Sequence, residues 1–358
     1  MKLALITDTH WGVRGDNQVF HDNTKKFLDN IFFPYLEKNE IWTIVHLGDL
    51  VDRRKYINIQ TAQRLRKDFI EVIHNNGYDY HQILGNHDLY YKNTTSVNSI
   101  QELYCADGYS NGNFHLYDKT TEVEFDDVKF LFVPWICQQN KEDTYAKIKS
   151  TKAQICLGHL ELQGFQMYKG SIATHGEDRK TFDKFDLTCS GHYHHRSTDN
   201  SITYLGSHGQ FTWSDYNDSR GFHILDTATR ELTFLENPYT MFEKVVYNDS
   251  NVTLNDIMNI NFSKFKDTFC KIIVKNKNNP YWFDMFCEKI EKVGVIDLQV
   301  VEDHFNLDLE NETEVVSEAE STVDIFKKYV AQINNPGVDV VKLENTLVDL
   351  YNRAVNLN

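Results

Sequence analysis

The sequence predicts an α/β protein: a two-sheet sandwich flanked by helices, followed by a small α/β domain and a C-terminal pair of helices. Short apolar runs alternate with longer amphipathic stretches over residues 1–151, a pattern typical of strands alternating with helices. Strand and glycine-turn signals crowd together over residues 202–234, where we expect an antiparallel part that completes the sandwich. The alternation then restarts after Pro238, which indicates a second unit.

The elements of the first unit follow from these patterns in order. Strands are expected where short apolar runs stand between polar segments, at residues 3–7, 42–47 and 81–84, within 114–133, and at 154–157 and 187–190. Helices are expected in the amphipathic stretches at residues 19–38, 60–75, 96–104 and 141–150.

The second unit and the tail divide the rest of the chain. Apolar runs at 242–247, 269–274 and 295–301 alternate with helical stretches at 254–261 and 282–292, which predicts a βαβαβ order. An acidic, polar segment follows, and after it two stripes of apolar residues at helical spacing: Phe326, Tyr329, Val330 and Ile333, then Leu343, Leu347, Leu350 and Ala354. The predicted division is therefore 1–237, 238–305, a linker at 306–322, and a helical pair at 323–358.

Composition restricts the class of protein. The 358 residues include 52 acidic and 37 basic side chains, a net charge of −15, which argues against a simple basic nucleic-acid-binding surface. Residues 301–358 hold 12 acidic and 4 basic residues, so more than half of the net charge lies in the tail. The six cysteines lack paired CxxC spacing and are expected to be buried thiols, with a zinc site as the alternative. No apolar stretch is long enough for a signal peptide or a membrane span, so a cytoplasmic protein is expected, in the host cytoplasm if the chain is viral.

Polar metal-binding residue types follow several of the predicted strands. The segments are Asp8-Thr9-His10, Gly48-Asp49-Leu50-Val51-Asp52, Gly85-Asn86-His87-Asp88, Gly158-His159 and Gly191-His192-Tyr193-His194. Loops at the carboxyl ends of strands in an α/β sheet meet at one edge, where ligands bind. A single Asp-x-His or Gly-His is usually an ordinary turn, but the whole ordered set predicts a site.

Seven side chains in these segments are candidate metal ligands: Asp8, His10, Asp49, Asn86, His159, His192 and His194. Seven donors are too many for one ion but suit two divalent ions that share a carboxylate, and Asp49 is the expected bridge because each of its oxygens could bind one ion. Two such ions, ~3.5 to 4 Å apart, acidify a water and offset phosphoryl charge. The pairs Asp8-x-His10 and His192-x-His194 would project to the same side if their segments are extended.

This ordered set resembles the calcineurin-like metallophosphoesterase superfamily over about residues 1–210, since D-x-H, G-D-x-x-D, G-N-H-D, G-H and G-H-x-H all occur. The resemblance implies one metal on Asp8, His10, Asp49 and His194, and the other on Asp49, Asn86, His159 and His192. It also implies that His87 is a catalytic histidine that is not a ligand, and that Asp88 orients it.

Features outside the motifs resemble one branch of that superfamily, the SbcD-type DNA repair nucleases and, within it, small subunits of T-even-type bacteriophage recombination endonucleases. These features are the start at Met1-Lys2-Leu3, the long helix at 19–38, the small domain after Pro238 and the terminal helices. The resemblance implies Mn²⁺-dependent cleavage of DNA ends, exonucleolytic on duplexes and endonucleolytic on single strands. It also implies a homodimer and an SMC-like coiled-coil ATPase partner that binds the terminal helices. Since the chain has no Gly-Lys dipeptide, and hence no Walker A loop, any ATPase must be another subunit.

Other functions remain open from the sequence. Asp52-Arg53 also fits the G-D-x-V-D-R segment of Ser/Thr phosphatases, although those usually carry G-N-H-E where this chain has Asp88. A phosphomonoesterase acting on nucleotides or phosphoproteins is therefore the alternative, and a non-enzymatic scaffold is a third. The basic run Arg53-Arg54-Lys55 is equally compatible with phosphate contact or a solvated surface, whereas Phe211 and Trp213 are expected in a core or an interface.

Overall fold

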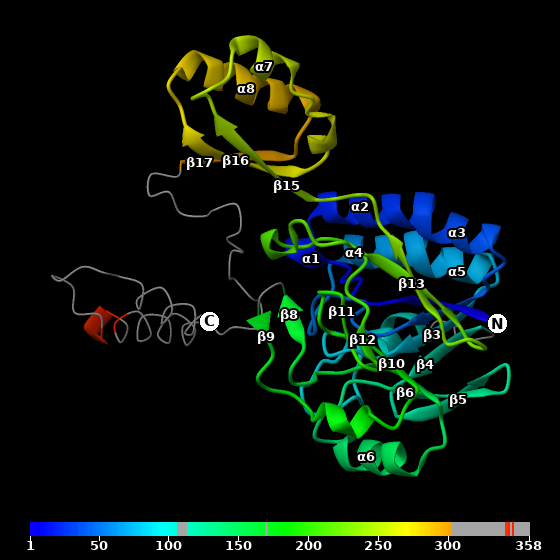
Figure 1. The fold of residues 1–358 in the computed structure, drawn as a ribbon. Coiled ribbons are helices and arrows are strands. Elements are labelled where there is room, and N and C mark those ends of the chain that lie inside the picture. The colour runs from blue at the N-terminus through cyan, green and yellow to red at the C-terminus, as the bar shows by residue number, and fades with distance from the viewer. Residues whose placement is uncertain (106–112, 169–170, 303–340, 344–345, 347–358) are drawn as a thin grey trace. The chain divides into compact units, whose positions relative to one another are not determined.

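The computed structural model describes residues 1–105, 113–168, 171–302, 341–343 and 346 (Figure 1). The chain divides into two compact units, 1–310 and 311–358. The helices and strands up to residue 302 all belong to the first unit. Most of the predicted linker at 306–322 and helical pair at 323–358 lies outside the described residues, and the predicted domain boundaries stay predictions.

The first sheet has six strands in the order β14-β13-β1-β2-β3-β4. Its strands are β1 (Lys2–Ile6), β2 (Thr43–His46), β3 (Asp79–Ile83), β4 (Phe114–Tyr117), β13 (Gly221–Asp226) and β14 (Leu232–Glu236). The four strands from β1 to β4 are parallel, whereas β13 and β14 pair antiparallel. Residues 221–236 therefore extend the first sheet rather than the second.

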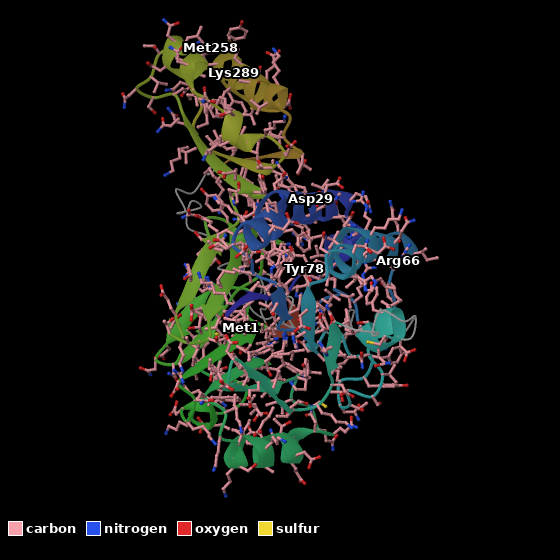
Figure 2. The ribbon with its side chains drawn as sticks, turned by 90° about the vertical axis from the view of Figure 1, so that its right-hand side faces the viewer. Met1, Asp29, Arg66, Tyr78, Met258 and Lys289 are labelled. Atoms are coloured by element: carbon pink, nitrogen blue, oxygen red, sulfur yellow. The ribbon has the colours of Figure 1, made fainter. Side chains whose placement is uncertain are left out.

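Two helical stretches cover one face of this sheet (Figure 1). The first comprises α1 (Val13–Asp16), α2 (Gln18–Phe27), η1 (Leu28–Phe32) and α3 (Phe33–Lys38); the second comprises α4 (Ile59–Leu65), η2 (Arg66–Ile70) and α5 (Glu71–Asn75). Both confirm the predicted helices, but each contains a π-turn at its middle. Tyr78, fully buried behind the second stretch, packs against Phe33 and Trp42, whereas Asp29 and Arg66 lie at the surface (Figure 2). The helix predicted at 96–104 is confirmed in part, since the described chain becomes helical only at residue 99 and continues into the π-turn η3 (Gln101–Cys105).

The second sheet has the order β11-β12-β10-β7-β6-β5. Its strands are β5 (Thr121–Phe125), β6 (Val128–Val133), β7 (Ile155–His159), β10 (Leu187–Gly191), β11 (Ser197–Asp199) and β12 (Ile202–Tyr204). Strand β12 runs parallel to β10 and antiparallel to β11, so the antiparallel expectation holds only in part. Helix α6 (Lys141–Ser150) and the turn η4 (Arg179–Phe182) pack on its outer face, and a hairpin of β8 (Gln166–Tyr168) and β9 (Ser171–Ile172) follows β7.

The two sheets pack face to face. Leu3, Leu5 and Val45 of the first sheet share a core with Phe130 and Leu157 of the second. Because both inner faces are apolar, the strand ends from the two sheets are held at one rim. This confirms the α/β sandwich.

A third, parallel sheet follows in the order β15-β16-β17, formed by β15 (Phe242–Asn248), β16 (Phe269–Asn276) and β17 (Asp297–Glu302). Helices α7 (Leu254–Asn259) and α8 (Pro280–Val293) and the turn η6 (Ser263–Phe265) complete the predicted βαβαβ order. Lys289 of α8 donates to the carbonyl oxygens of Met258 and Ile260, which joins the two helices (Figure 2).

Phe211 and Trp213, which lies in the turn η5 (Trp213–Asp215), belong to an apolar cluster that also contains Phe20, Phe242 and Phe269. The Trp213 and Phe242 ring centroids are 4.9 Å apart. Both residues are therefore in packed contacts, as expected, and they connect the third sheet with the sandwich. None of the six cysteines forms a disulfide, and none joins a candidate metal cluster among the described residues. In the same part of the chain, no helix combines the length and apolar character needed to cross a membrane.

Candidate metal centre

All seven candidate ligands come together at one rim of the sandwich. Each is the last residue of a strand or lies in the loop that follows it: Asp8 and His10 after β1, Asp49 after β2, Asn86 after β3, His159 at the end of β7, and His192 and His194 after β10. Because these strands run parallel within each sheet, their carboxyl ends converge. The sequence segments are far apart, so the fold alone makes them neighbours.

One group of donors consists of Asp8, His10 and His194. The Nε2 atoms of the two histidines lie 3.0 Å apart, and Asp8 Oδ1 lies 3.9 Å from the first and 4.0 Å from the second. The Asp8 carboxylate is itself held by the Thr7 hydroxyl at 2.8 Å and by the backbone N–H of His192. Three ligand atoms thus face one small volume.

A second group consists of Asp49, His159 and His192, with Asn86 between them. His159 Nε2 lies 3.3 Å from Asp49 Oδ2 and 3.1 Å from Asn86 Oδ1. The same Asn86 oxygen lies 3.0 Å from His192 Nδ1. This set matches the second predicted metal position.

Asp49 is common to both groups through a single oxygen. Its Oδ2 lies 3.7 Å from His10 Nε2 and 3.3 Å from His159 Nε2. Its Oδ1 accepts the backbone N–H of His87 at 2.7 Å. The expectation that each oxygen serves one ion is therefore wrong: Oδ2 faces both groups, and Oδ1 is held by the backbone.

The chemistry of the donors fits cations at these two places. His159 Nδ1 donates to the Leu47 carbonyl at 2.7 Å, and its Nε2 faces two oxygens, so the lone pair of a neutral ring would repel them unless a proton or a metal ion lay between them. Burial disfavours the charged rings, yet the neighbouring Asp52 and Asp49 raise the pKa of His10 to about 9, and Asp49 does the same for His159. One histidine of each group is thus held beside negative charge, whereas burial lowers the pKa of the other histidine, His194 or His192.

Comparison with known proteins agrees with this geometry. The family model described as calcineurin-like phosphoesterase matches residues 1–196, more than half of the chain. The chain belongs to the calcineurin-like phosphoesterase family. Membership confirms the resemblance drawn from the motifs and implies hydrolysis of phosphoesters with divalent metal ions.

Two relatives extend the match beyond the family domain. Exonuclease subunit 1 of Enterobacteria phage T4 is 31% identical over 337 residues, covering 93% of both chains. The SbcD subunit of the nuclease SbcCD of Staphylococcus epidermidis is 27% identical over 80% of this chain and 79% of its own. A solved structure described as a novel archaeal phosphodiesterase aligns over 66% of this chain and 100% of its own, with 16% identity and a TM-score of 0.35.

Four donors of this phosphoesterase have strained backbone, among thirteen non-glycine residues with positive φ in the described part of the chain. Asp8, His10, Asp49 and His192 have φ values of 51°, 43°, 55° and 89°, in the left-handed region that residues with a side chain rarely adopt. The expectation of extended i, i+2 pairs is therefore wrong. Such conformations cost on the order of 1–3 kcal/mol each and persist where the surrounding structure enforces them.

Glycines beside the donors provide space rather than turns alone. A Cβ on Gly85 would lie 2.2 Å from Asp49 Oδ1, although the φ of Gly85 is not positive. At Gly48 glycine is needed for its conformation and for space, because the φ is 102° and a Cβ there would lie 2.5 Å from His159 Nδ1. The loops after β2 and β3 therefore approach more closely than any side chain would permit.

His87 lies beside the donors with its ring held from one side. Its Nδ1 bonds to the carbonyl oxygen of Asp52, and its ring meets that of His10 edge-on at 4.8 Å. Since a carbonyl only accepts, Nδ1 carries the hydrogen, and Nε2 is the atom free to gain or release a proton.

The predicted role of Asp88 is wrong. Within the described residues its carboxylate accepts four backbone N–H groups, from Asp49, Leu50, Val51 and Gly85, at 2.8 to 3.3 Å, and makes no bond to the His87 ring. Burial and the charge of Asp49 raise the pKa of Asp88 to about 7. Asp88 joins the two loops that carry Asp49 and His87, so it acts on the backbone.

Two further carboxylates lie beside ligand rings. The sequence places Asp52 in the G-D-x-x-D segment without a role, and it does not identify Glu161. Asp52 Oδ1 lies 3.5 Å from His10 Nδ1, and Glu161 Oε1 lies 3.7 Å from His192 Nε2. Carboxylates behind ligand histidines fix the ring and its tautomer. Glu161 stands two residues after His159, and this spacing, the same as in Asp8-x-His10, is the signal that could have identified it.

Proposed function

We propose that this chain is the nuclease subunit of a DNA-end-processing complex and hydrolyses phosphodiesters with two divalent ions, most suitably Mn²⁺. The observation that carries the proposal is Asp49 Oδ2, which faces one donor group at 3.7 Å and the other at 3.3 Å. The names of the two relatives, an exonuclease subunit and a nuclease subunit, support a nucleic acid as the substrate, and the resemblance to SbcD-type DNA repair nucleases favours DNA.

Each donor group would hold one ion. Asp8, His10, Asp49 and His194 would hold the first, and Asp49, Asn86, His159 and His192 the second. Imidazole with carboxylate and amide oxygen suits Mn²⁺ among other transition ions. When bound, such a pair acidifies a water and offsets the charge on the phosphoryl oxygens.

The protein residues would orient the phosphodiester and handle the proton. Water would bond to phosphorus and release a proton to solvent, the bond from phosphorus to the leaving sugar oxygen would break, and that oxygen would take a proton from His87 Nε2. His87 would then regain a proton from solvent, so that the net change is hydrolysis of the phosphodiester. The carbonyl of Asp52 keeps the other nitrogen protonated and aims the ring. Positioned acids of this kind contribute roughly 10²–10⁴-fold to a rate.

Arg54 is the basic residue beside the site that supports phosphate binding. Its neighbour Arg53 is already paired with Asp16 at 2.8 Å. The Nη1 atom of Arg54 is buried without a hydrogen-bond partner in the described part of the chain. Burial lowers the pKa of Arg54, and Asp49 opposes that shift. A DNA phosphate would supply the missing partner.

The test of the proposal is cleavage of a DNA oligonucleotide with Mn²⁺. Wild-type protein should cleave, and His87→Asn should lose roughly 10²-fold or more in kcat while it retains bound Mn²⁺. His74→Ala, on α5, is the matched histidine control and should cleave normally. Absence of cleavage with any divalent ion would contradict the proposal. Turnover of p-nitrophenyl phosphate or nucleotides far above that of DNA would instead favour the phosphomonoesterase.

A partner is proposed on separate grounds. Both relatives are named as subunits, and the sequence predicts an apolar helical pair after the acidic linker. We expect this pair to bind a coiled-coil ATPase and the chain to form a homodimer. Tagged full-length chain should recover the ATPase from cells, and a chain ending at residue 320 should not.

A further inference from the structure

A second set of metal-binding side chains lies away from the catalytic rim, on β3 and on the edge strand β4. It consists of Asp79, His81 and His115, whose ligand atoms lie within 4.8 Å of one another. His81 Nε2 lies 3.1 Å from Asp79 Oδ2, and His115 Nε2 lies 2.9 Å from Asp79 Oδ1. One carboxylate thus faces two imidazole nitrogens.

The two imidazoles are held nearly parallel by the sheet. His81 and His115 are register partners on adjacent parallel strands, and their rings stack with centroids 4.6 Å apart at 22°. Neighbouring strands are about 4.8 Å apart, so the backbone sets this spacing. The arrangement needs no rearrangement of the main chain to bring both Nε2 atoms to one ion.

The His81 ring is further fixed from behind. Its Nδ1 bonds to the Tyr117 hydroxyl at 2.8 Å, and the rings of Phe125 and Phe132 meet it edge-on. A hydrogen bond on the second nitrogen is the usual support of a metal-binding histidine. Burial lowers the pKa of His81, which leaves it neutral and able to coordinate.

The cluster is accessible to an ion from solvent. The His81 side chain is only 5% exposed, whereas those of Asp79 and His115 are 41% and 42% exposed. The cluster lies near the amino end of β3, and Asn86 of the catalytic rim follows the carboxyl end of the same strand. From His81 to Asn86 the extended chain spans on the order of 15 Å.

We propose that Asp79, His81 and His115 form a further metal site for a zinc-class transition ion. Two imidazoles and one carboxylate with a water in the fourth position match the ligands of zinc and exclude Mg²⁺ and Ca²⁺, which require mostly oxygen. The ion would clamp β4, the edge of the first sheet, to β3. The inference does not rest on the proposed nuclease function.

The experiment is a zinc count on the full chain. Wild type, His115→Ala, Asp79→Asn and the control His74→Ala are equilibrated with micromolar Zn²⁺, dialysed and measured by mass spectrometry for bound zinc per chain. His115→Ala and Asp79→Asn should each hold one ion fewer than wild type and the control. Equal zinc in all four proteins would overturn the site, because the three side chains then only hydrogen-bond to one another.

Two controls separate this result from others. Circular dichroism checks that the variants fold, and His115 is exposed enough for its removal to be tolerated. Mn²⁺-dependent hydrolysis by His115→Ala should equal that of wild type, because His115 is not in the catalytic rim. A loss of hydrolysis together with the zinc would contradict the separation of the two sites.

Discussion

Asp49 brings the two donor groups together through one oxygen, and its other oxygen is held by the His87 backbone. The carboxylate cannot turn without losing this bond, so Oδ2 stays directed at both histidine groups. The left-handed φ of 55° at Asp49 is part of the same constraint. A single residue therefore sets how far apart the two donor groups lie.

Asp88→Asn tests the backbone role of the neighbouring carboxylate. The side-chain amide of the variant would direct its own N–H group at backbone N–H groups that now donate to the carboxylate. One or two of those backbone groups would then lose their hydrogen-bond acceptor. The free energy of unfolding should fall by about 2–4 kcal/mol, measured by urea denaturation in chelator. Asp284→Asn, on the exposed face of α8, should change it by less than about 0.5 kcal/mol. A stable but inactive Asp88→Asn would indicate a chemical role instead.

The common rim of the seven donors could be predicted because each stands at or just after the end of one of five predicted strands. The hydrogen bonds and short contacts that these donors make could not be predicted. Which oxygen of Asp49 faces the histidines, and which backbone groups the Asp88 carboxylate accepts, depend on the close approach of loops that lie far apart in the sequence. Glu161 was missed for the same reason, since its partner His192 comes from another strand.

The loops after β2 and β3 are joined by hydrogen bonds and close packing. Asp88 accepts N–H groups from both, and Gly85 lies against Asp49. The strand before the first loop, β2, was predicted to within one residue at each end because it lies in an apolar run, whereas β3 carries polar residues and begins two residues before its predicted start. The π-turns at Leu28–Phe32 and Arg66–Ile70 were not predicted. One extra residue in a single turn hardly changes the apolar periodicity of a long helix.

Gly85→Ala tests the close approach of these loops. A Cβ 2.2 Å from Asp49 Oδ1 must displace that side chain or the loop, so we expect destabilisation by roughly 1–3 kcal/mol and loss of Mn²⁺ binding. Gly209→Ala is the matched control, because its nearest atom would be 3.9 Å away. Thermal unfolding and metal content give the two readouts. Full metal binding by Gly85→Ala would contradict the account of the rim.

At the scale of the whole molecule, the sandwich holds buried neutral histidines that make its stability depend on pH. His223 of β13 is an example outside the rim: burial, with Arg196 nearby, lowers its pKa to about 3. Below the unfolded value of about 6.5 the unfolded chain takes up a proton that the folded chain does not. Proton uptake by the unfolded chain therefore lowers the free energy of unfolding as the pH falls from about 6.5 toward 3.

His223→Phe isolates that contribution. Between pH 7 and pH 5 in chelator, the free energy of unfolding of the variant should fall by about 1–2 kcal/mol less than that of wild type, because the variant has no proton to take up there. Urea denaturation of both proteins at the two pH values gives the difference. An equal or larger fall in the variant would show that His223 is charged in the folded protein.

Electron paramagnetic resonance of the Mn²⁺-loaded full chain can detect two metal ions that share Asp49. Ions bridged by one oxygen, ~3.5 to 4 Å apart, give an exchange-coupled spectrum that isolated ions do not. Wild type and His87→Asn should both show the coupled spectrum, and Asp49→Asn should lose it. A coupled spectrum that survives in Asp49→Asn, or its absence from wild type with two Mn²⁺ bound, would contradict the account.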